Sequence, residues 1–390
     1  MRDILWVEGA VVSVFRNNID QDSKGESQMA SIDLDSGANA TVGIIANPAS
    51  GKDIRRLTAH GSVFDNNEKV NIVRRVLLGL EAAGVDTVLY MPDYYGIIRR
   101  ALDGIRLSIN LQVLDMPMTG RQEDSSEAAR GMAAAGVRCL VTLGGDGTNR
   151  AVARGSRSVP LMPISTGTNN VFPVMVEGTL AGLAAGVVAT GVVPADEATV
   201  PSNLLEVLFD GEPVDLALVD IAVYDDAFVG SRAVWEMSKV RDVLTARAAP
   251  HNIGLSAISG CLCRAQIEGR HGSHLRLALP GEDGVEVTAP VAPGIVQSIR
   301  VSSYRLLEVG DEIEVDLVPA VLALDGEREI ETSRQKRVSI RFTDRGPRVV
   351  DVNRALQLAT QRSYFHSAAG LTPGLYHCTQ ICASPCLACE

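Results

Sequence analysis

The clearest chemical signal in the chain is the segment GGDGT at residues 144–148, which directly follows an apolar run at 139–143. Glycines at the end of a buried strand let the backbone approach a polyphosphate, and successive N–H groups can form an anion-binding concavity. A carboxylate beside phosphates is repelled, so Asp146 suggests a bridge to a metal ion or the acceptance of a proton. The alternative interpretation is an ordinary Gly-rich turn with Asp146 as a loop residue.

Two further polar Gly loops follow predicted strands: NPASGK at 47–52 and STGTNN at 165–170. In a doubly wound sheet the carboxyl ends of the strands meet at one edge, so the three loops are expected to converge. Lys52 and Arg150 are the nearest candidate counter-charges for phosphate, and the alternative is that each is a solvated surface cation. Together the loops predict a phosphate-binding edge.

The elements that must position these loops form two blocks. Up to about residue 192, apolar strands (41–46, 87–91, 111–114, 139–143, 159–164) alternate with helices (69–83, 95–102, 179–189, and one with a capping box from Asp124 to Glu127). Strands that are apolar throughout indicate a parallel sheet covered on both faces. Later runs are short and separated by Gly, Pro and Asp, which is typical of antiparallel sheet. The predicted fold class is an α/β N-terminal doubly wound domain plus a mainly antiparallel β C-terminal domain.

The expected organisation has five parts. A flexible leader at 1–40 precedes an α/β nucleotide-phosphate-binding domain at 41–192 and a β-rich substrate-binding domain at 193–345. A return segment at 346–370, with a helix near 353–358, leads to a Cys-rich tail at 371–390. The spacing Cys382-x₃-Cys386-x₂-Cys389 in the tail matches a metal or iron–sulfur ligand pattern, and the alternative is an exposed, oxidisable terminus.

Composition excludes several function classes. The 390 residues are 46% hydrophobic and 4% aromatic with a net charge of −11, which fits a globular chain. An acidic balance argues against coating nucleic acid or anionic membrane, and no run approaches the ~20 apolar residues of a membrane helix. An odd count of seven cysteines suits a reducing compartment, so we expect a cytoplasmic protein without nucleic-acid or membrane partners.

The order and spacing of NP-x-SGK, GGDGT and GTNN resemble the superfamily of NAD kinases, diacylglycerol kinases and sphingosine kinases. Residues 252–260, the Pro-rich run at 289–293 and the Asp-Gly turn at 324–327 resemble second-domain segments of the NAD kinases. The resemblance spans about residues 42–342. It is strongest to the NAD-kinase-like branch that includes the acetoin-operon AcoX proteins.

This resemblance implies a role for each matching residue. Asp146 would accept the proton of the acceptor hydroxyl, which in NAD kinases is the 2′-OH of the adenosine ribose, and Glu327 is a rival base by analogy with lipid kinases. Asp220 matches the acid of a ribose-binding pair whose Asn is replaced here by Val219, and its alternative is an ordinary strand-end Asp. Substrate-binding residues would be Asp220, Ser256 and Asp325. The nucleotide- or phosphate-binding residues would be Asn47, Ser50, Gly51, Lys52, Gly144, Gly145, Gly147, Thr148, Thr168, Asn169 and Asn170.

The resulting hypothesis is a kinase that uses Mg²⁺ or another divalent cation and ATP or polyphosphate to convert NAD to NADP, with NAD and ATP as its ligands. The resemblance also implies a homo-oligomer, and the ligands of the metal are not assigned. Two alternatives stay open. One is a kinase for a lipid or another small hydroxyl compound, and the other is a catalytically silent nucleotide sensor of a catabolic operon.

Overall fold

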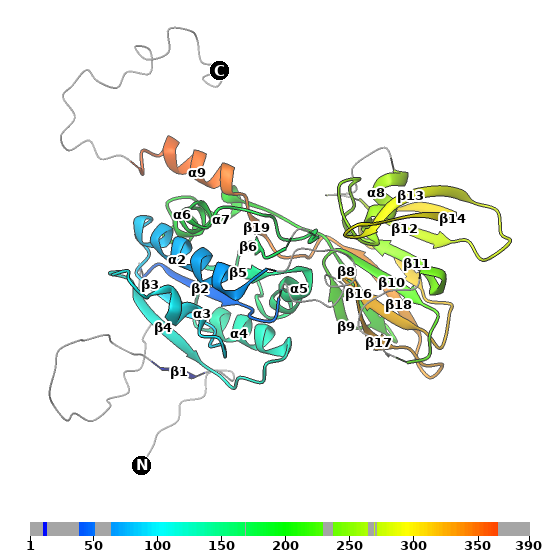
Figure 1. The fold of residues 1–390 in the computed structure, drawn as a ribbon, viewed down its shortest axis with the longest axis horizontal. Coiled ribbons are helices and arrows are strands. Elements are labelled where there is room, and N and C mark those ends of the chain that lie inside the picture. The colour runs from blue at the N-terminus through cyan, green and yellow to red at the C-terminus, as the bar shows by residue number, and fades with distance from the viewer. Residues whose placement is uncertain are drawn as a thin grey trace, which may run out of the picture.

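Two domains make up the described part of the chain (Figure 1). The computed structural model describes residues 11–13, 39–50, 64–167, 169–228, 237–263, 269 and 271–365. Most of the leader, the Cys-rich tail and the predicted site residues Gly51, Lys52 and Thr168 lie outside the described residues. None of the helices in the described parts combines the length and apolarity needed to cross a membrane.

The N-terminal domain is built on an eight-stranded sheet with the order β1-β4-β3-β2-β5-β6-β19-β7. The run from β4 through β6 is parallel, as the apolar strands predict. β1 pairs antiparallel at one edge, while β19 continues the parallel run and carries β7 antiparallel at the other. The strands are β1 (Val11–Ser13), β2 (Thr41–Ala46), β3 (Thr87–Tyr90), β4 (Asn110–Asp115), β5 (Cys139–Gly144), β6 (Leu161–Ser165), β7 (Thr199–Val200) and β19 (Val349–Val350).

Helices cover both faces of this sheet. Side chains of α2, α3, α6 and α9 share one core with the sheet, and those of α4 and α5 share another on the opposite face. Figure 1 shows α2, α6 and α9 stacked on one side and α4 on the other. The helices are α2 (Asn66–Ala82), α3 (Ile97–Ala101), α4 (Glu123–Ala134), α5 (Asp146–Gly155), α6 (Gly178–Ala189), the short α7 (Ala195–Ala198) and α9 (Val352–Gln361).

The C-terminal domain contains two antiparallel sheets. A seven-stranded sheet has the order β13-β14-β12-β11-β10-β16-β17, and a four-stranded sheet has the order β15-β18-β8-β9. Apolar side chains such as Val207, Ile221 and Ile340 fill the space between the sheets, and α8 covers the other face of the larger one. The elements are β8 (Leu204–Phe209), β9 (Glu212–Ala217), β10 (Asp220–Tyr224), the 3₁₀ helix Met237–Lys239, β11 (Val240–Thr245), α8 (Ser256–Leu262), β12 (His271–Leu277), β13 (Val285–Ala292), β14 (Ile295–Glu308), β15 (Glu312–Glu314), β16 (Val321–Leu324), β17 (Glu327–Glu331) and β18 (Val338–Thr343). The predicted fold class is therefore confirmed.

Two local predictions need correction. Asp124 does not form a capping box, because its carboxylate accepts the N–H groups of Thr119 and Gly120 in the preceding loop. The segment from Asp146 is helix α5 rather than an open loop, so Gly147 and Thr148 lie in a first helical turn. Residues 252–260, which the sequence marks only by a resemblance, lead into helix α8.

The chain crosses between the domains twice, before β8 and before β19. The two crossings touch, because the Ser202 hydroxyl donates to the carbonyl oxygen of Pro347 at 2.5 Å. After the second crossing α9 packs on the first domain, where the Tyr364 hydroxyl donates to the carbonyl oxygen of Ala83 at 2.9 Å. The C-terminal helix is thus part of the N-terminal domain.

Candidate active site

The predicted loops meet where the strand order of the first sheet reverses. β2 lies beside β5, while the chain runs outward from β2 to β3 in the other direction. In open parallel sheets a ligand crevice forms at such a point, beyond the carboxyl ends of the strands. A cleft of about 1140 Å³ lies there, with walls from both domains. Its lining includes Asn47, Ser50, Gly145, Asp146, Gly147, Thr148, Asn169 and Asn170 from the first domain and Asp220, Asp325 and Glu327 from the second.

The first loop is tied to the second by Asn47. Its side-chain amide donates to the Thr148 hydroxyl at 3.0 Å, and its backbone N–H donates to the carbonyl oxygen of Leu143 at 3.1 Å. The Ser50 hydroxyl lies 3.1 Å from that of Thr166, which follows β6. Side chains and backbone from three strand ends therefore form one connected edge.

A buried lysine supports the first loop from below. The Lys69 ammonium, on α2, donates to the carbonyl oxygens of Asn47 at 2.8 Å and Ser50 at 2.6 Å and to the Asn66 side chain at 3.0 Å. Lys69 is fully buried, and a buried ammonium group is stable only when its N–H donors have hydrogen-bond partners. Sequence reasoning missed Lys69, because a lysine in the first turn of an amphipathic helix has the same pattern as a solvated one.

Helix α5 begins at Asp146, with Gly145 as the residue before it. A Cβ atom on Gly145 would lie 2.8 Å from the Asn170 side-chain oxygen, and one on Gly144 would lie 2.4 Å from the Cβ of Thr148. Gly144 is needed because the Thr148 Cβ cannot move away from it, whereas the end of the Asn170 side chain could move aside for a Cβ at Gly145. The first N–H groups of a helix have no partner within the helix, so those of this turn are available to an anion.

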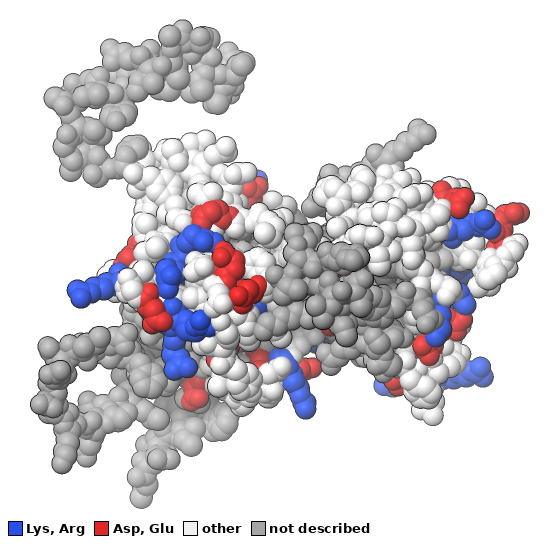
Figure 2. Space-filling view, viewed as in Figure 1, with Lys and Arg blue, Asp and Glu red and all other residues white. Residues whose placement is uncertain are grey.

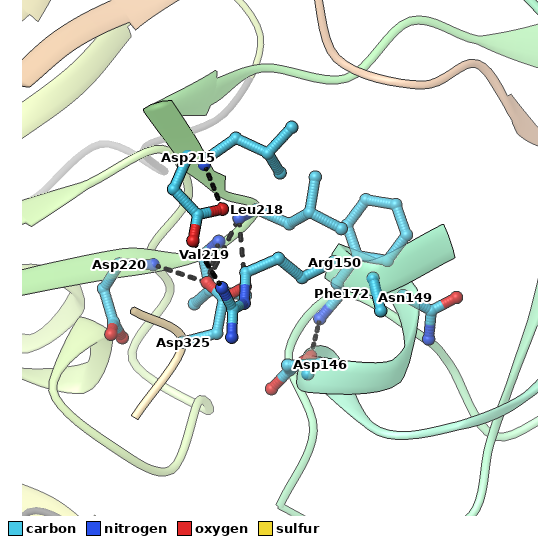
Figure 3. Close-up of polar contacts among 12 residues, drawn as sticks. Asp146, Asn149, Arg150, Phe172, Asp215, Leu218, Val219, Asp220 and Asp325 are labelled. Atoms are coloured by element: carbon cyan, nitrogen blue, oxygen red, sulfur yellow. Dashed lines mark hydrogen bonds and ion pairs between the residues drawn. The ribbon is translucent and has the colours of Figure 1, made fainter. Parts of the chain in front are cut away.

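The Asp146 carboxylate is held at the start of α5. It accepts the N–H groups of Val171, at 3.0 and 3.1 Å, and of Phe172, at 2.7 Å (Figure 3). Burial raises the pKa of Asp146 to about 7, and the neighbouring Asp325 carboxylate adds to the rise, while both N–H donors and Arg247 oppose it. A carboxyl that lines a cleft and has a pKa raised toward neutral pH is suited to exchange a proton with a ligand.

Asp325 faces Asp146 from the second domain. Its carboxylate accepts the N–H groups of Val219 at 2.8 Å, Leu218 at 3.1 Å and Asp220 at 3.3 Å. Burial raises the pKa of Asp325, and the guanidinium of Arg150 works against that rise. Asp325 therefore organises the start of β10, where Asp220 also lines the cleft and is 5% exposed.

Glu327 and Gln122 approach the first turn of α5 from two sides. A Cβ atom added to Gly147 would lie 3.7 Å from a Glu327 carboxylate oxygen and 3.3 Å from the Gln122 amide nitrogen. The Gln122 amide donates to the carbonyl oxygen of Gly147 at 2.7 Å. The rival base Glu327 is thus brought to the same turn as Asp146, and Gln122 is a lining residue that the sequence did not single out.

Arg150 has neither of the predicted roles. Its side chain is fully buried and is not among the lining residues, so it is not a cleft counter-charge or a surface cation. It instead approaches Asp215 and Asp325 of the second domain, as Figure 3 shows. Ser256 is also fully buried and does not line the described cleft, although the preceding Gly254 and Leu255 do.

The described lining of the cleft is strongly acidic. Its only basic side chain is Arg121, against seven carboxylates, which are Asp93, Glu123, Asp124, Asp146, Asp220, Asp325 and Glu327. Within the described residues, however, no three His, Cys, Asp or Glu side chains are grouped closely enough to hold a metal ion by themselves. The carboxylates suit Mg²⁺ shared with a phosphate ligand, since Mg²⁺ typically takes one or two protein carboxylates.

Comparison with known proteins identifies both halves of the chain. The family model of the ATP-NAD kinase N-terminal domain matches residues 42–192, and that of the acetoin catabolism protein X C-terminal domain matches residues 203–345. Acetoin catabolism protein X of Cupriavidus necator is 38% identical over 338 residues, covering 84% of this chain and 94% of the relative.

Solved structures give weaker similarities. Yeast NADH kinase, complexed with NADH, aligns at a TM-score of 0.44 and 14% identity over 86% of this chain and 91% of its own. A diacylglycerol kinase from Bacillus anthracis gives 0.38 and 13% over 81% and 98%. An NAD kinase from Archaeoglobus fulgidus, in complex with ATP, gives 0.35 and 13% over 73% and 100%.

The match to the N-terminal domain model and the two-domain architecture define the class, a chain with an NAD kinase-like fold. Within that class the chain belongs to the acetoin catabolism protein X family.

Proposed function

We propose that this protein transfers the terminal phosphoryl group of ATP, or of polyphosphate, to the 2′-hydroxyl of the adenosine ribose of NAD. The observation that carries the proposal is the placement of the Asp146 carboxylate, which lines the interdomain cleft at the start of α5 and is fixed there by the N–H groups of Val171 and Phe172. The match to the ATP-NAD kinase N-terminal domain supports the choice of donor and acceptor.

The donor would lie on the first domain. Backbone N–H groups in the first turn of α5, at Gly147 and Thr148, would donate hydrogen bonds to phosphate oxygens. Asn47 and Ser50 of the first loop would contact the same phosphates. Asn169 and Asn170 line the adjacent wall and would contact the nucleotide. A divalent cation would neutralise part of the phosphate charge and is needed because carboxylates dominate this lining.

The acceptor would lie on the second domain, against Asp220 and Asp325. In the transfer step the Asp146 carboxylate takes the proton of the acceptor hydroxyl. At the same time the oxygen of that hydroxyl forms a bond to the terminal phosphorus. The bond between that phosphorus and the bridging oxygen breaks, and ADP or a shortened polyphosphate leaves. A base works best when its pKa lies near the operating pH, which favours Asp146 for this role.

The deciding experiment incubates the purified protein with Mg-ATP and NAD and measures NADP. Asp146→Asn is expected to lower turnover by about 100-fold or more, since a positioned general base contributes roughly 10²–10⁴-fold. ATP binding, measured by calorimetry, should stay close to that of the unchanged protein. Asp283→Asn, on an exposed turn of the second domain, is the matched control and should keep full activity.

Other outcomes would separate the parts of the proposal. Full activity in Asp146→Asn with loss in Glu327→Gln would transfer the role of base to Glu327. Phosphorylation of another hydroxyl compound, but not of NAD, would refute the acceptor and keep the phosphotransferase. ATP binding without a product from a broad panel of acceptors would instead favour a nucleotide sensor.

A further inference from the structure

Arg150 occupies an unusual place in this molecule. It lies one helical turn beyond Asp146 on α5, and its side chain is completely excluded from solvent. One terminal nitrogen of its guanidinium lies 3.4 Å from a carboxylate oxygen of Asp215, and its Nε lies 3.7 Å from one of Asp325 (Figure 3). A residue of the first domain is thus buried against two acids of the second.

The burial of the Arg150 charge requires that its two carboxylate partners stay in place. An arginine side chain stays protonated in proteins, so its burial is tolerated only while carboxylates remain beside it. Asp325 is itself fixed by the N–H groups of Leu218, Val219 and Asp220, and Asp215 is on β9. The Arg150 guanidinium therefore links α5 to β9, to the start of β10 and to the β16–β17 turn.

We propose that Arg150 is a positioning residue that fixes α5, and with it Asp146, against the acceptor side of the cleft. Asp146 and Arg150 are four residues apart on one helix, so a shift of one end of α5 moves the other. Asp325 and Asp220 share the cleft with Asp146, and the same Asp325 is held by Arg150. The interdomain contact thereby sets the distance between the proposed base and the acceptor wall.

Arg154 provides an internal comparison. It lies one turn further along α5 and contacts the same Asp215 oxygen at 2.5 Å, but its side chain is 30% exposed. Exposed ion pairs contribute little, whereas removing one partner of a buried pair costs far more. Arg150 and Arg154 therefore differ in burial and in the contact to Asp325 while sharing a helix, a charge and a partner.

The kinetic part of this inference rests on the proposed function. Replacing Arg150→Met should lower kcat about 100-fold, as expected for a misplacement of about 1 Å between reacting groups. The Kd for Mg-ATP should stay within about threefold, because the proposed donor site is built from the first domain alone. Arg150→Lys should recover part of kcat, and the control Arg154→Met should stay near the unchanged protein.

A second measurement does not require activity. Amide hydrogen exchange of residues 218–220 reports their bonds to Asp325, so Arg150→Met should accelerate exchange there and Arg154→Met should not. If Arg150→Met does not fold, Arg150→Lys should show the same two changes in weaker form.

Each outcome bears on one claim. Unchanged exchange at residues 218–220 and unchanged kcat in Arg150→Met would overturn the positioning role. Equal effects of Arg154→Met would overturn it as well, since they would trace to Asp215 alone. If the unchanged protein phosphorylates no acceptor, the proposed function fails, and the exchange comparison still decides whether Arg150 holds the second domain.

Discussion

At the scale of single residues, burial rather than residue type sets the chemistry of the cleft. Asp146 is partly buried and the Asp325 side chain is fully buried, and desolvation raises the pKa of both carboxyls above the ordinary value. Their hydrogen-bond donors and the cations Arg247 and Arg150 oppose that rise. The two carboxyls in one cleft thus lie in environments that differ in their hydrogen-bond donors and in their cationic neighbours, and the charge of Asp325 contributes to the raised pKa of Asp146.

The pH dependence of activity follows from Asp146. With a pKa of about 7, the base form is lost below neutral pH, so kcat/KM should fall as the pH decreases through that value. Asp325→Asn removes a negative charge that raises the pKa of Asp146, so the acidic limb should move to lower pH. A pH profile of the residual rate measures this, with Asp283→Asn as the control. A limb that stays in place would contradict the coupling.

The raised pKa of Asp146 also makes the free energy of unfolding depend on pH. Because the pKa of Asp146 is raised in the folded state from 3.8 to about 7, the folded protein binds more protons than the unfolded chain between these values. Its contribution is therefore present below about pH 4 and lost as the pH rises through 7. Asp146→Asn should raise the free energy of unfolding at pH 8 by on the order of a few kcal/mol, with little change at pH 4. Thermal melts at both pH values test this, and equal differences would be evidence against the raised pKa.

At the scale of elements, the site depends on helices that approach one another closely. A Cβ atom on Gly182 of α6 would lie 2.3 Å from the carbonyl oxygen of Val76 on α2, and one on Gly79 would lie 2.4 Å from that of Thr179. The α2–α6 contact is therefore made by backbone against backbone. Because α2 also carries Lys69, this packing supports the first loop of the cleft.

A substitution in this contact should destabilise the first domain. Gly182→Val must separate the two helices, since a backbone carbonyl cannot move aside, and overpacking of this kind costs about 1–3 kcal/mol. A lower midpoint of chemical denaturation would show it. Leu180→Ala, at a position of the same helix that is 44% exposed, is the control, with an expected change below about 1 kcal/mol. Equal stability of Gly182→Val would mean that the helices have room to adjust.

At the scale of the whole molecule, polar contacts and an apolar cluster of Phe172 with Leu218 and Val219 join the domains. The paired crossings meet at Ser202 and Pro347, and Arg150 bridges to Asp215 and Asp325 on the side of the cleft. On the visible face of the N-terminal domain, acidic and basic side chains intermingle (Figure 2). Among the described residues, the cleft is lined by seven carboxylates and a single arginine.

That imbalance predicts a strict need for a divalent cation. Chelation with EDTA should lower phosphoryl transfer by at least about 100-fold, since a metal supplies several kcal/mol of charge stabilisation, and added Mg²⁺ should restore it. The rate of NADP formation measures both steps. Full turnover in EDTA would show that the carboxylates have another purpose, such as binding a cationic part of the ligand.

The sequence alone determined the parallel α/β block, the antiparallel block after it and the convergence of the described loop segments, because strand hydrophobicity and Gly punctuation are local signals. It also found Asp146, Asp220, Asp325 and Glu327, which the structure places around one cleft. Only the tertiary structure decided that GGDGT starts a helix, that Asp146 has a pKa near 7, and that Lys69 and Arg150 are buried. These properties depend on which groups surround a side chain in the folded molecule: Lys69 is enclosed by the first loop of its own domain, and Arg150 by two acids of the other domain.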